Sequence, residues 1–249
     1  MQDMSDTVDF GFADIPRHEK ASRVQGLFGD VAARYDVMND LMSAGVHRLW
    51  KRALLDTLQP RADMHLLDVA GGTGDVAFGA LARAPDMRVT LCDLTPAMLQ
   101  CGRTRALNRG QHRGLQYVCA NAERLPLRAR CIDAYTIAFG LRNVTDRMQA
   151  LREAWRVLKP GGKFLCLEFS QVTIDALAPL YDAFSFRVIP HLGKWITGDG
   201  APYRYLVESI RRFPNQEHLA SMLRDSGFSC VRYRSLSGGI AALHWGIRA

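Results

Sequence analysis

The sequence predicts an α/β fold: a doubly wound, mostly parallel sheet of seven strands that ends in an antiparallel hairpin. Strand-like and helix-like segments alternate through the middle of the chain, which is typical of parallel β–α units. Two strand-like runs at 231–236 and 240–247 follow, and the Ser-Gly-Gly run between them is a hairpin signal. The length of 249 residues suits one large domain, and a hydrophobic fraction of 48% is ordinary for a globular core.

Local signals place the individual elements. Apolar residues between positions 19 and 58 recur at helical spacing and predict an N-terminal helical segment, whereas residues 1–15 are expected to be frayed. Thr95-Pro96 predicts a helix start with proline at its first position, and the run KPGG at 159–162 predicts a helix stop and turn. The expected strands are 65–70, 88–94, 115–121, 132–139 and 163–169, and the expected helices between them are 75–84, 96–108 and 146–158.

The alternation stops after Ser170. Residues 171–205 are long, apolar and aromatic, so we expect a substrate cap there, or equally an ordinary helical lid packed on the sheet. Helices near 206–212 and 216–225 follow it. There is no internal repeat and no low-complexity linker, so all elements are assigned to a single domain over residues 1–249.

A glycine-rich turn joins the first strand of the sheet to the next helix. The run LLDVAGGTGD occupies residues 66–75, and Asp93 ends the following strand about 20 residues after the turn. Glycines let the backbone pass close to a ligand, and an acid at this spacing can accept hydrogen bonds from a ribose. The pattern predicts a nucleotide-like cofactor. The alternative is a glycine-rich strand-to-helix turn that binds no ligand.

Two cofactors fit this turn. Residues 72–77 match the G-x-G-x-x-A fingerprint of dinucleotide sites, which would indicate an NAD-dependent oxidoreductase. However, Asp75 lies in the first turn of the helix, where a carboxylate repels pyrophosphate. S-adenosylmethionine has no phosphate and carries a positive sulfonium, so the sequence favours S-adenosylmethionine.

Composition and charge limit the kinds of binding partner and the cellular location that the sequence predicts. The formal net charge is +7 and the pI about 9.3, which suits nucleic acid or an anionic membrane surface equally in principle, but no nucleic-acid-binding motif is found. The six cysteines form no C-x-x-C pair and the seven histidines lack ligand spacing, so no metal site is expected. No apolar run approaches the roughly 18 residues that span a bilayer, and the N-terminus lacks signal-peptide features. A cytoplasmic location is expected.

Three stretches resemble the ubiquinone/menaquinone biosynthesis C-methyltransferase family. They are YDVMNDLMSAGVHRLW at 35–50, which is highly specific, RVLKPGGKFLCLEFS at 156–170, and AFGLRNV at 138–144. The resemblance covers the chain from about Phe10 to the C-terminus. Many members of the family carry serine where Ala138 stands here, which puts one polar contact to the cofactor in doubt but not the activity.

The resemblance implies a Rossmann-like class I methyltransferase fold and methyl transfer from S-adenosylmethionine to a ring carbon of a polyprenylated quinol. The sequence does not distinguish benzoquinol from naphthoquinol. A lipid-soluble quinol is the expected small-molecule partner, and no nucleic acid is expected. Peripheral contact at the inner face of the membrane, a quinone-biosynthesis complex and a homodimer are further candidates.

The expected cofactor site combines the turn with residues of the next two strands. Glycines of the turn allow close approach to the amino-acid tail, the Thr73 hydroxyl can bond that tail, and Asp93 can accept both ribose hydroxyls. Leu94 and Met98 can cover the adenine, and by resemblance Asn121 and Ala122 also take part, although Asn121 fits a turn residue as well. The cofactor-binding set is Gly71, Gly72, Thr73, Gly74, Asp93, Leu94, Met98, Asn121, Ala122 and Ala138.

The chemistry calls for a group that stabilises a phenolate and one that accepts a proton, because a neutral ring carbon is a weak nucleophile. Arg142 can stabilise an oxyanion, Asn143 can orient it, and Tyr35 or a water that it positions can take part in proton transfer. The alternatives are a surface cation at Arg142 and a core aromatic at Tyr35. His47 and Trp50 share a helix face and are expected to pack in the core or line the pocket.

Other functions remain open at this stage. The basic pI motivates an RNA-modifying methyltransferase, which would want aromatic and Asn-Pro-Pro-type contacts to a flipped base, and the stretch at 138–141 lacks them. A non-enzymatic scaffold in a quinone-biosynthetic assembly is a further alternative, but the intact glycine-rich turn and Asp93 argue against a dead cofactor site.

Overall fold

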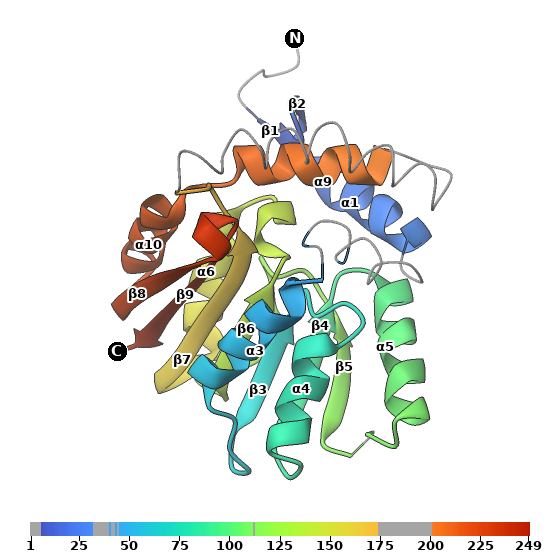
Figure 1. Ribbon diagram of the computed structural model, residues 1–249, viewed down its shortest axis with the longest axis vertical. Coiled ribbons are helices and arrows are strands. Elements are labelled where there is room, and N and C mark those ends of the chain that lie inside the picture. Colours follow the sequence, from blue (N-terminus) through green and yellow to red (C-terminus); the bar gives the residue numbers. More distant parts are fainter. Residues whose placement is uncertain (1–5, 32–39, 41–42, 44, 112, 174–200) are drawn as a thin grey trace.

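A seven-stranded sheet forms the centre of the structure, a computed structural model that describes residues 6–31, 40, 43, 45–111, 113–173 and 201–249 (Figure 1). The strand order is β5-β4-β3-β6-β7-β9-β8. The strands are β3 (His65–Val69), β4 (Arg88–Asp93), β5 (Leu115–Cys119), β6 (Ile132–Ala138), β7 (Leu158–Phe169), β8 (Phe228–Leu236) and β9 (Ala241–Arg248).

The strand pairing confirms the predicted fold class. The pairs β3–β4, β4–β5, β3–β6 and β6–β7 are parallel, whereas β9 runs antiparallel to both β7 and β8. The Ser237–Gly239 turn forms a short 3-10 helix, η4, between β8 and β9, as the hairpin signal predicts. Several boundaries shift by a few residues, and β8 begins at Phe228 rather than at 231. The predicted turn at 159–162 differs in kind, because these residues belong to β7, where a register shift in the β6–β7 pairing accommodates them.

Helices cover both faces of the sheet. The helices α3, α4 and α5 contribute apolar side chains to one core cluster, and α6 and α10 contribute to another. The helices α1 and α9 lie across the end of the sheet where the parallel strands finish (Figure 1). The helices are α1 (Arg17–Val31), α3 (His47–Leu58), α4 (Asp75–Arg83), α5 (Pro96–Asn108), η2 (Leu141–Asn143), α6 (Arg147–Val157), α9 (Ala201–Arg212) and α10 (Gln216–Asp225).

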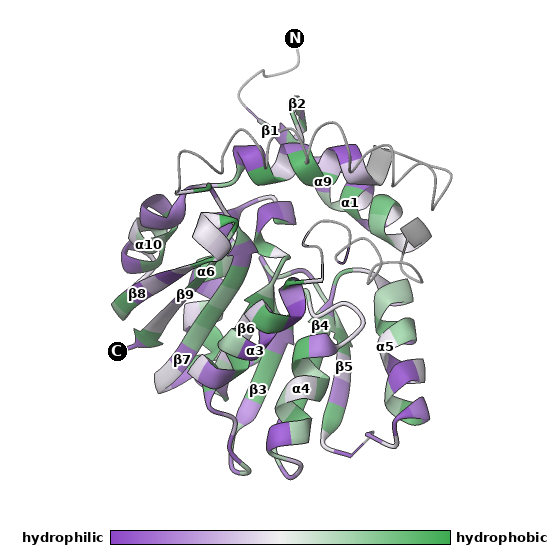
Figure 2. Cartoon of the chain, in the orientation of Figure 1, coloured by the Kyte–Doolittle hydropathy of each residue, from purple (hydrophilic) through white to green (hydrophobic). Residues whose placement is uncertain are grey.

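The two core clusters follow from the alternation of side chains along a strand. Leu66 belongs to the cluster with α3 and α4, and its neighbour Leu67 to the cluster with α6, because successive side chains point to opposite faces. The hydrophobic colouring accordingly runs along the central strands and the helix faces against them (Figure 2). A sheet buried on both faces holds the ends of its strands, and therefore the loops that follow them, in fixed positions.

The expectation that residues 1–15 are frayed is wrong for residues 7–15. They form an antiparallel hairpin of β1 (Thr7–Phe10) and β2 (Ala13–Pro16). Long-range contacts hold it: the Phe10 ring stacks on Tyr205 of α9, and Asp9 pairs with Lys20 and Arg147. Such contacts leave no local signal in a short segment.

Part of what the sequence predicts lies outside the described residues. Of the N-terminal segment 19–58, the structure describes α1 and α3, but Tyr35 lies between them in a stretch that is not described. Of the predicted cap at 171–205, only 171–173 and the beginning of α9 are described, so the cap and the domain assignment stay predictions. Among the described helices, none has the length and apolar character needed to cross a membrane.

Candidate active site

The main cleft opens at the carboxyl ends of β3, β4, β5 and β6, where ligands bind in doubly wound sheets. It encloses about 730 Å³, its open mouth included, and α1 forms one wall. Its lining residues are Ala21, Val24, Phe28, Val69, Ala70, Gly72, Asp93, Leu94, Thr95, Met98, Ala120, Asn121, Ala122, Glu123, Phe139, Gly140, Asn143, Val144 and Thr145.

The glycine-rich turn separates this cleft from a smaller one. Gly72 has a φ of +55°, and a Cβ there would meet nothing closer than Met98 Sδ at 4.0 Å, so its backbone faces open space. Gly71 is needed for packing instead, because a Cβ there would lie 2.3 Å from Leu91. A Cβ on Gly74, at φ +91°, would lie 2.9 Å from the Phe78 ring, and Gly74 lines neither cleft. Packing at the start of α4 therefore accounts for a glycine at position 74. The predicted contact of Gly74 with the cofactor stays a prediction.

Asp93 lies at the edge of the main cleft with its carboxylate held by the backbone. Oδ2 accepts the amide hydrogen of Gly72 at 2.9 Å and Oδ1 that of Thr95 at 2.8 Å. Burial raises the pKa of Asp93, while these amide hydrogen bonds act in the opposite direction. The carboxylate lines the cleft, where its oxygens can accept hydrogen bonds from hydroxyl groups of a ligand.

The wall beside Asp93 suits a flat aromatic base. Leu94, Met98 and Ala122 line it with apolar surface, and Asn121 stands among them. The Oδ1 atom of Asn121 accepts the amide hydrogen of Glu123 at 2.9 Å, which confirms the turn role considered for this residue. Its Nδ2 group is left as the donor that Asn121 can present to a ligand.

A smaller cleft lies on the other side of the turn and carries charges of both signs. Lys51 of α3, Asp68 of β3 and Asp75 of α4 line it together with Gly71, Thr73 and Ala138. Lys51 Nζ lies 2.6 Å from Asp75 Oδ2, and Arg105 bonds both Asp75 Oδ1 at 3.1 Å and Thr73 Oγ1 at 2.5 Å. Burial would raise the pKa of Asp75, but Lys51 and Arg105 outweigh it, so the pKa is lowered and the charge is retained.

Asp68 is the least satisfied polar group of the smaller cleft. Its Oδ1 atom accepts the Thr136 hydroxyl hydrogen at 2.7 Å, but Oδ2 makes no hydrogen bond within the described part of the chain. The residue is 1% exposed, and burial raises its pKa to about 7. A buried carboxylate facing a cleft is a ready partner for an ammonium group. Lys51 of the same cleft is paired with Asp75, but an ammonium has three hydrogens and can also donate to a carboxylate of a ligand.

Arg142 does not line either cleft. Its guanidinium and the Glu168 carboxylate are both buried, with Nη1 2.8 Å from Oε1, and Nη1 also donates to the Phe139 carbonyl at 2.5 Å. The pair anchors the loop after β6 to the end of β7. The guanidinium of Arg142 is buried against Glu168 and lines neither cleft. Its direct stabilisation of an oxyanion stays a prediction.

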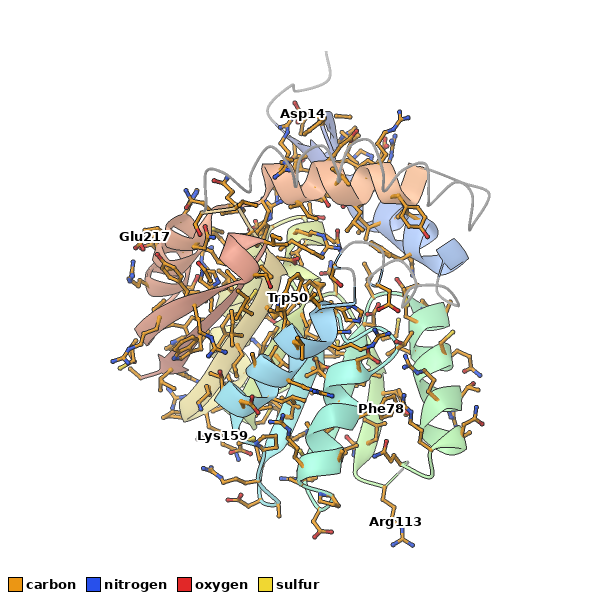
Figure 3. All side chains as sticks on the ribbon, in the orientation of Figure 1. Asp14, Trp50, Phe78, Arg113, Lys159 and Glu217 are labelled. Carbon is orange, nitrogen blue, oxygen red and sulfur yellow. The ribbon has the colours of Figure 1, made fainter. Side chains whose placement is uncertain are left out.

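Asn143 is the predicted catalytic residue that does line the main cleft. Tyr35, its expected partner in proton transfer, lies outside the described residues. Trp50 packs between α3 and the sheet, where its ring meets Phe139 and Phe169 (Figure 3). His47 is also buried, so core packing accounts for both residues of that helix face.

Asp68 and Lys51, two charged residues of the smaller cleft, are not among the predicted site residues. Asp68 carries a usable signal, because it is an acid inside an otherwise apolar strand run, and such a residue is rarely buried without a partner. Lys51 carries none, because one cation on an amphipathic helix is indistinguishable from a solvated face until the helix is placed. The described residues hold no cluster of three or more metal-ligating side chains.

The strand order, the glycine-rich turn and the acid at the end of β4 together define a class I S-adenosylmethionine-dependent methyltransferase. A solved S-adenosylmethionine-dependent methyltransferase from Thermotoga maritima shares the fold, with a TM-score of 0.63 at 18% identity over 90% of this chain and 99% of that one. The chain belongs to the ubiE/COQ5 methyltransferase family, whose model matches residues 17–248.

Relatives match the chain over nearly its full length. It is 56% identical over 243 residues, or 96% of both chains, to the ubiquinone/menaquinone biosynthesis C-methyltransferase UbiE of Methylobacterium nodulans. It is 53% identical over 247 residues, or 99% of both chains, to the protein of the same name from a Ruegeria strain. These findings confirm the family resemblance and do not favour the RNA-modifying alternative.

Proposed function

We propose that this chain transfers a methyl group from S-adenosylmethionine to a ring carbon of a polyprenylated quinol in ubiquinone or menaquinone biosynthesis. The observation that carries the proposal is the full-length identity of 53–56% to relatives that bear this activity in their names. The charge pattern of the two clefts supports the choice of cofactor. Asp75 at the start of α4 disfavours a pyrophosphate, whereas Asp68 and Lys51 suit the ammonium and carboxylate of an amino-acid tail.

The residues of both clefts would divide the cofactor between them. Asp93 would hold the ribose hydroxyls, Leu94, Met98, Asn121 and Ala122 the adenine, and Asp68, Lys51 and Thr73 the tail. Gly71, Gly72 and Ala138 would form the passage between the two clefts. When bound, S-adenosylmethionine supplies an electrophilic methyl group on a sulfonium. The absence of a hydroxyl at Ala138 leaves the polar contacts of the tail to its neighbours.

The protein's part in the reaction is alignment, exclusion of water and placement of charge. Asn143 faces the main cleft and can donate a hydrogen bond to a ring oxygen, which favours the electron-rich phenolate form of the quinol. The apolar wall of Val24, Phe28 and Val144 excludes water from that end. The roles of Tyr35 and Arg142, the peripheral membrane contact, the complex and the homodimer stay predictions.

The reaction is tested directly by mass spectrometry. We expect that the protein, given S-adenosylmethionine and a short-tailed demethyl benzoquinol kept reduced, yields a product heavier by one methyl group on a ring carbon. Product from a demethylmenaquinol alone would assign the protein to menaquinone biosynthesis. Absence of product from both quinols, with cofactor binding confirmed by calorimetry, would contradict the proposal and revive the RNA-modifying alternative.

Asp93→Ala tests the cofactor site independently of turnover. The substitution removes the acceptor of two hydroxyl groups, and hydrogen bonds to a charged group contribute about 1.5–3 kcal/mol each. We therefore expect the Kd for S-adenosylmethionine to rise by at least about 100-fold in calorimetry. Asp133→Ala is the matched control, because Asp133 also accepts a backbone amide hydrogen, from His65, but lines neither cleft. Equal affinity of Asp93→Ala and the wild type would exclude the ribose role.

A further inference from the structure

Asn143 has a second contact, on the side away from the main cleft. The Tyr205 hydroxyl of α9 donates to Asn143 Oδ1 at 3.1 Å, across 62 residues of sequence. Tyr205 is buried and does not line the cleft, whereas Asn143 does. The tyrosine therefore lies behind the asparagine, outside the lining of the main cleft.

The Tyr205 hydroxyl is held in place and stays protonated. Its ring stacks on Phe10 of the N-terminal hairpin, with centroids 4.4 Å apart, and α9 packs into the main core cluster through Leu206 and Ile210. Burial raises the pKa of the Tyr205 hydroxyl. The nearby cations Arg142 and Arg147 lower this pKa, whereas the carboxylates Asp9 and Glu168 raise it further. Because the pKa is raised, the phenol keeps its hydrogen at neutral pH and can donate it to Asn143.

This contact decides which way the Asn143 amide faces. An asparagine side chain ends in one oxygen that only accepts and one NH2 group that only donates. Because Tyr205 donates to the oxygen, the NH2 group is the edge left for the cleft. A donor at that place favours a ligand oxygen on which negative charge develops, and it disfavours a ligand that presents a hydrogen.

We propose that Tyr205 is a positioning residue that fixes the Asn143 amide so that its NH2 group faces the quinol oxygen. The inference rests on the proposed function, because it assigns the amide a partner on that substrate. It also gives the N-terminal hairpin and α9 a task in the reaction: both hold the tyrosine whose hydroxyl sets the orientation.

A double-mutant cycle in turnover tests this proposal. Without the hydroxyl the amide can rotate, so Tyr205→Phe should lower kcat about tenfold and change the KM for S-adenosylmethionine less than about twofold. Asn143→Ala should lower kcat by at least as much. In the Asn143→Ala background, Tyr205→Phe should have no further effect, because the group through which it acts is gone. Tyr135→Phe, which removes a buried phenolic hydroxyl from the sheet core, is the matched control and should leave kcat unchanged.

Multiplying effects of the two substitutions would overturn the proposal, because they would show that Tyr205 acts independently of Asn143. A second readout needs no turnover. In Asn143→Asp, the Tyr205 hydroxyl would stabilise the charged form of the introduced carboxylate, so adding Tyr205→Phe should raise its pKa, read by NMR, by about one unit. An unchanged pKa would also overturn the proposal. A wild-type protein that transfers no methyl group would instead contradict the proposed function, and the NMR result would stand apart from it.

Discussion

Arg142→Ala is expected to lower the free energy of unfolding by about 3–5 kcal/mol, because it leaves the buried Glu168 carboxylate without its cation. The Arg142 and Glu168 side chains are 0% and 1% exposed. A folded domain has only about 5–15 kcal/mol of stability in total, so this loss would be visible in urea unfolding and would depress activity whether or not Arg142 takes part in the chemistry.

The double variant Arg142→Met with Glu168→Leu separates the structural from the chemical role. Replacing both partners by apolar side chains removes the uncompensated charge, so we expect most of the lost stability to return. If Arg142 also stabilises an oxyanion, turnover should remain low in this stable protein; recovered turnover would exclude that role. Arg23→Ala breaks an exposed pair with Glu19 and should cost less than about 1 kcal/mol. A comparably small loss for Arg142→Ala would contradict the burial argument.

Asp68→Asn is expected to raise the Kd for S-adenosylmethionine about 10- to 100-fold at pH 8, because the amide cannot pair with the ammonium of the tail as a carboxylate can. The same substitution should leave the ligand-free protein as stable or more stable, measured by thermal unfolding. Removing a charge that is buried and only half hydrogen-bonded relieves a desolvation penalty. Weaker binding together with an intact or more stable fold is the signature expected of a ligand-binding carboxylate.

The pH dependence follows from the raised pKa of Asp68, about 7 against the usual 3.8. Because the folded-state pKa is raised, the contribution of this group to stability is fully present below pH 3.8 and is lost as the pH rises through 7. The affinity for the cofactor is expected to rise with pH, because only the charged form of Asp68 pairs with an ammonium. Affinity in the wild type should therefore increase up to about pH 7 and level off above it, and in Asp68→Asn it should not follow this curve.

Thr136→Val is the matched variant for this titration. It removes the Thr136 hydrogen bond, which favours the charged form of Asp68, without altering the carboxylate itself. The midpoint of the affinity–pH curve should move to higher pH. An affinity that is independent of pH between 5.5 and 8 in the wild type would remove Asp68 from the tail site.

The contrast between Asp93 and Asp68 shows how far sequence reasoning reaches into the site. The position of Asp93 at the cleft could be predicted because it is set by spacing along the chain: a turn, a helix and a strand of ordinary length bring the end of β4 beside the turn. Asp68 lies in an apolar strand run, which is a signal of its burial, but its place in the site also depends on Lys51, which α3 brings to the same cleft. The arrival of Lys51 does not follow from the local sequence.

Arg142 and Asn143 are adjacent, and they too differ in what the sequence predicts and what packing decides. The family resemblance marks both, but only the packing of the loop after β6 sends Arg142 to Glu168 and Asn143 to the cleft. Which way the Asn143 amide faces then depends on Tyr205, which lies far along the chain in α9. Adjacent side chains diverge in this way because a tight loop points them to opposite sides.

Local sequence is enough to predict the doubly wound sheet, the terminal hairpin, the glycine-rich turn with Asp93 at the end of the next strand, and the family, since each depends on contiguous residues or on a fixed spacing. Long-range packing sets the rest: the N-terminal hairpin, the meeting of Asp68 and Lys51 in the smaller cleft, the burial of Arg142 and the contact of Tyr205 with Asn143. The physical reason is that burial, and with it the strength of charges and hydrogen bonds, depends on which distant segments pack together.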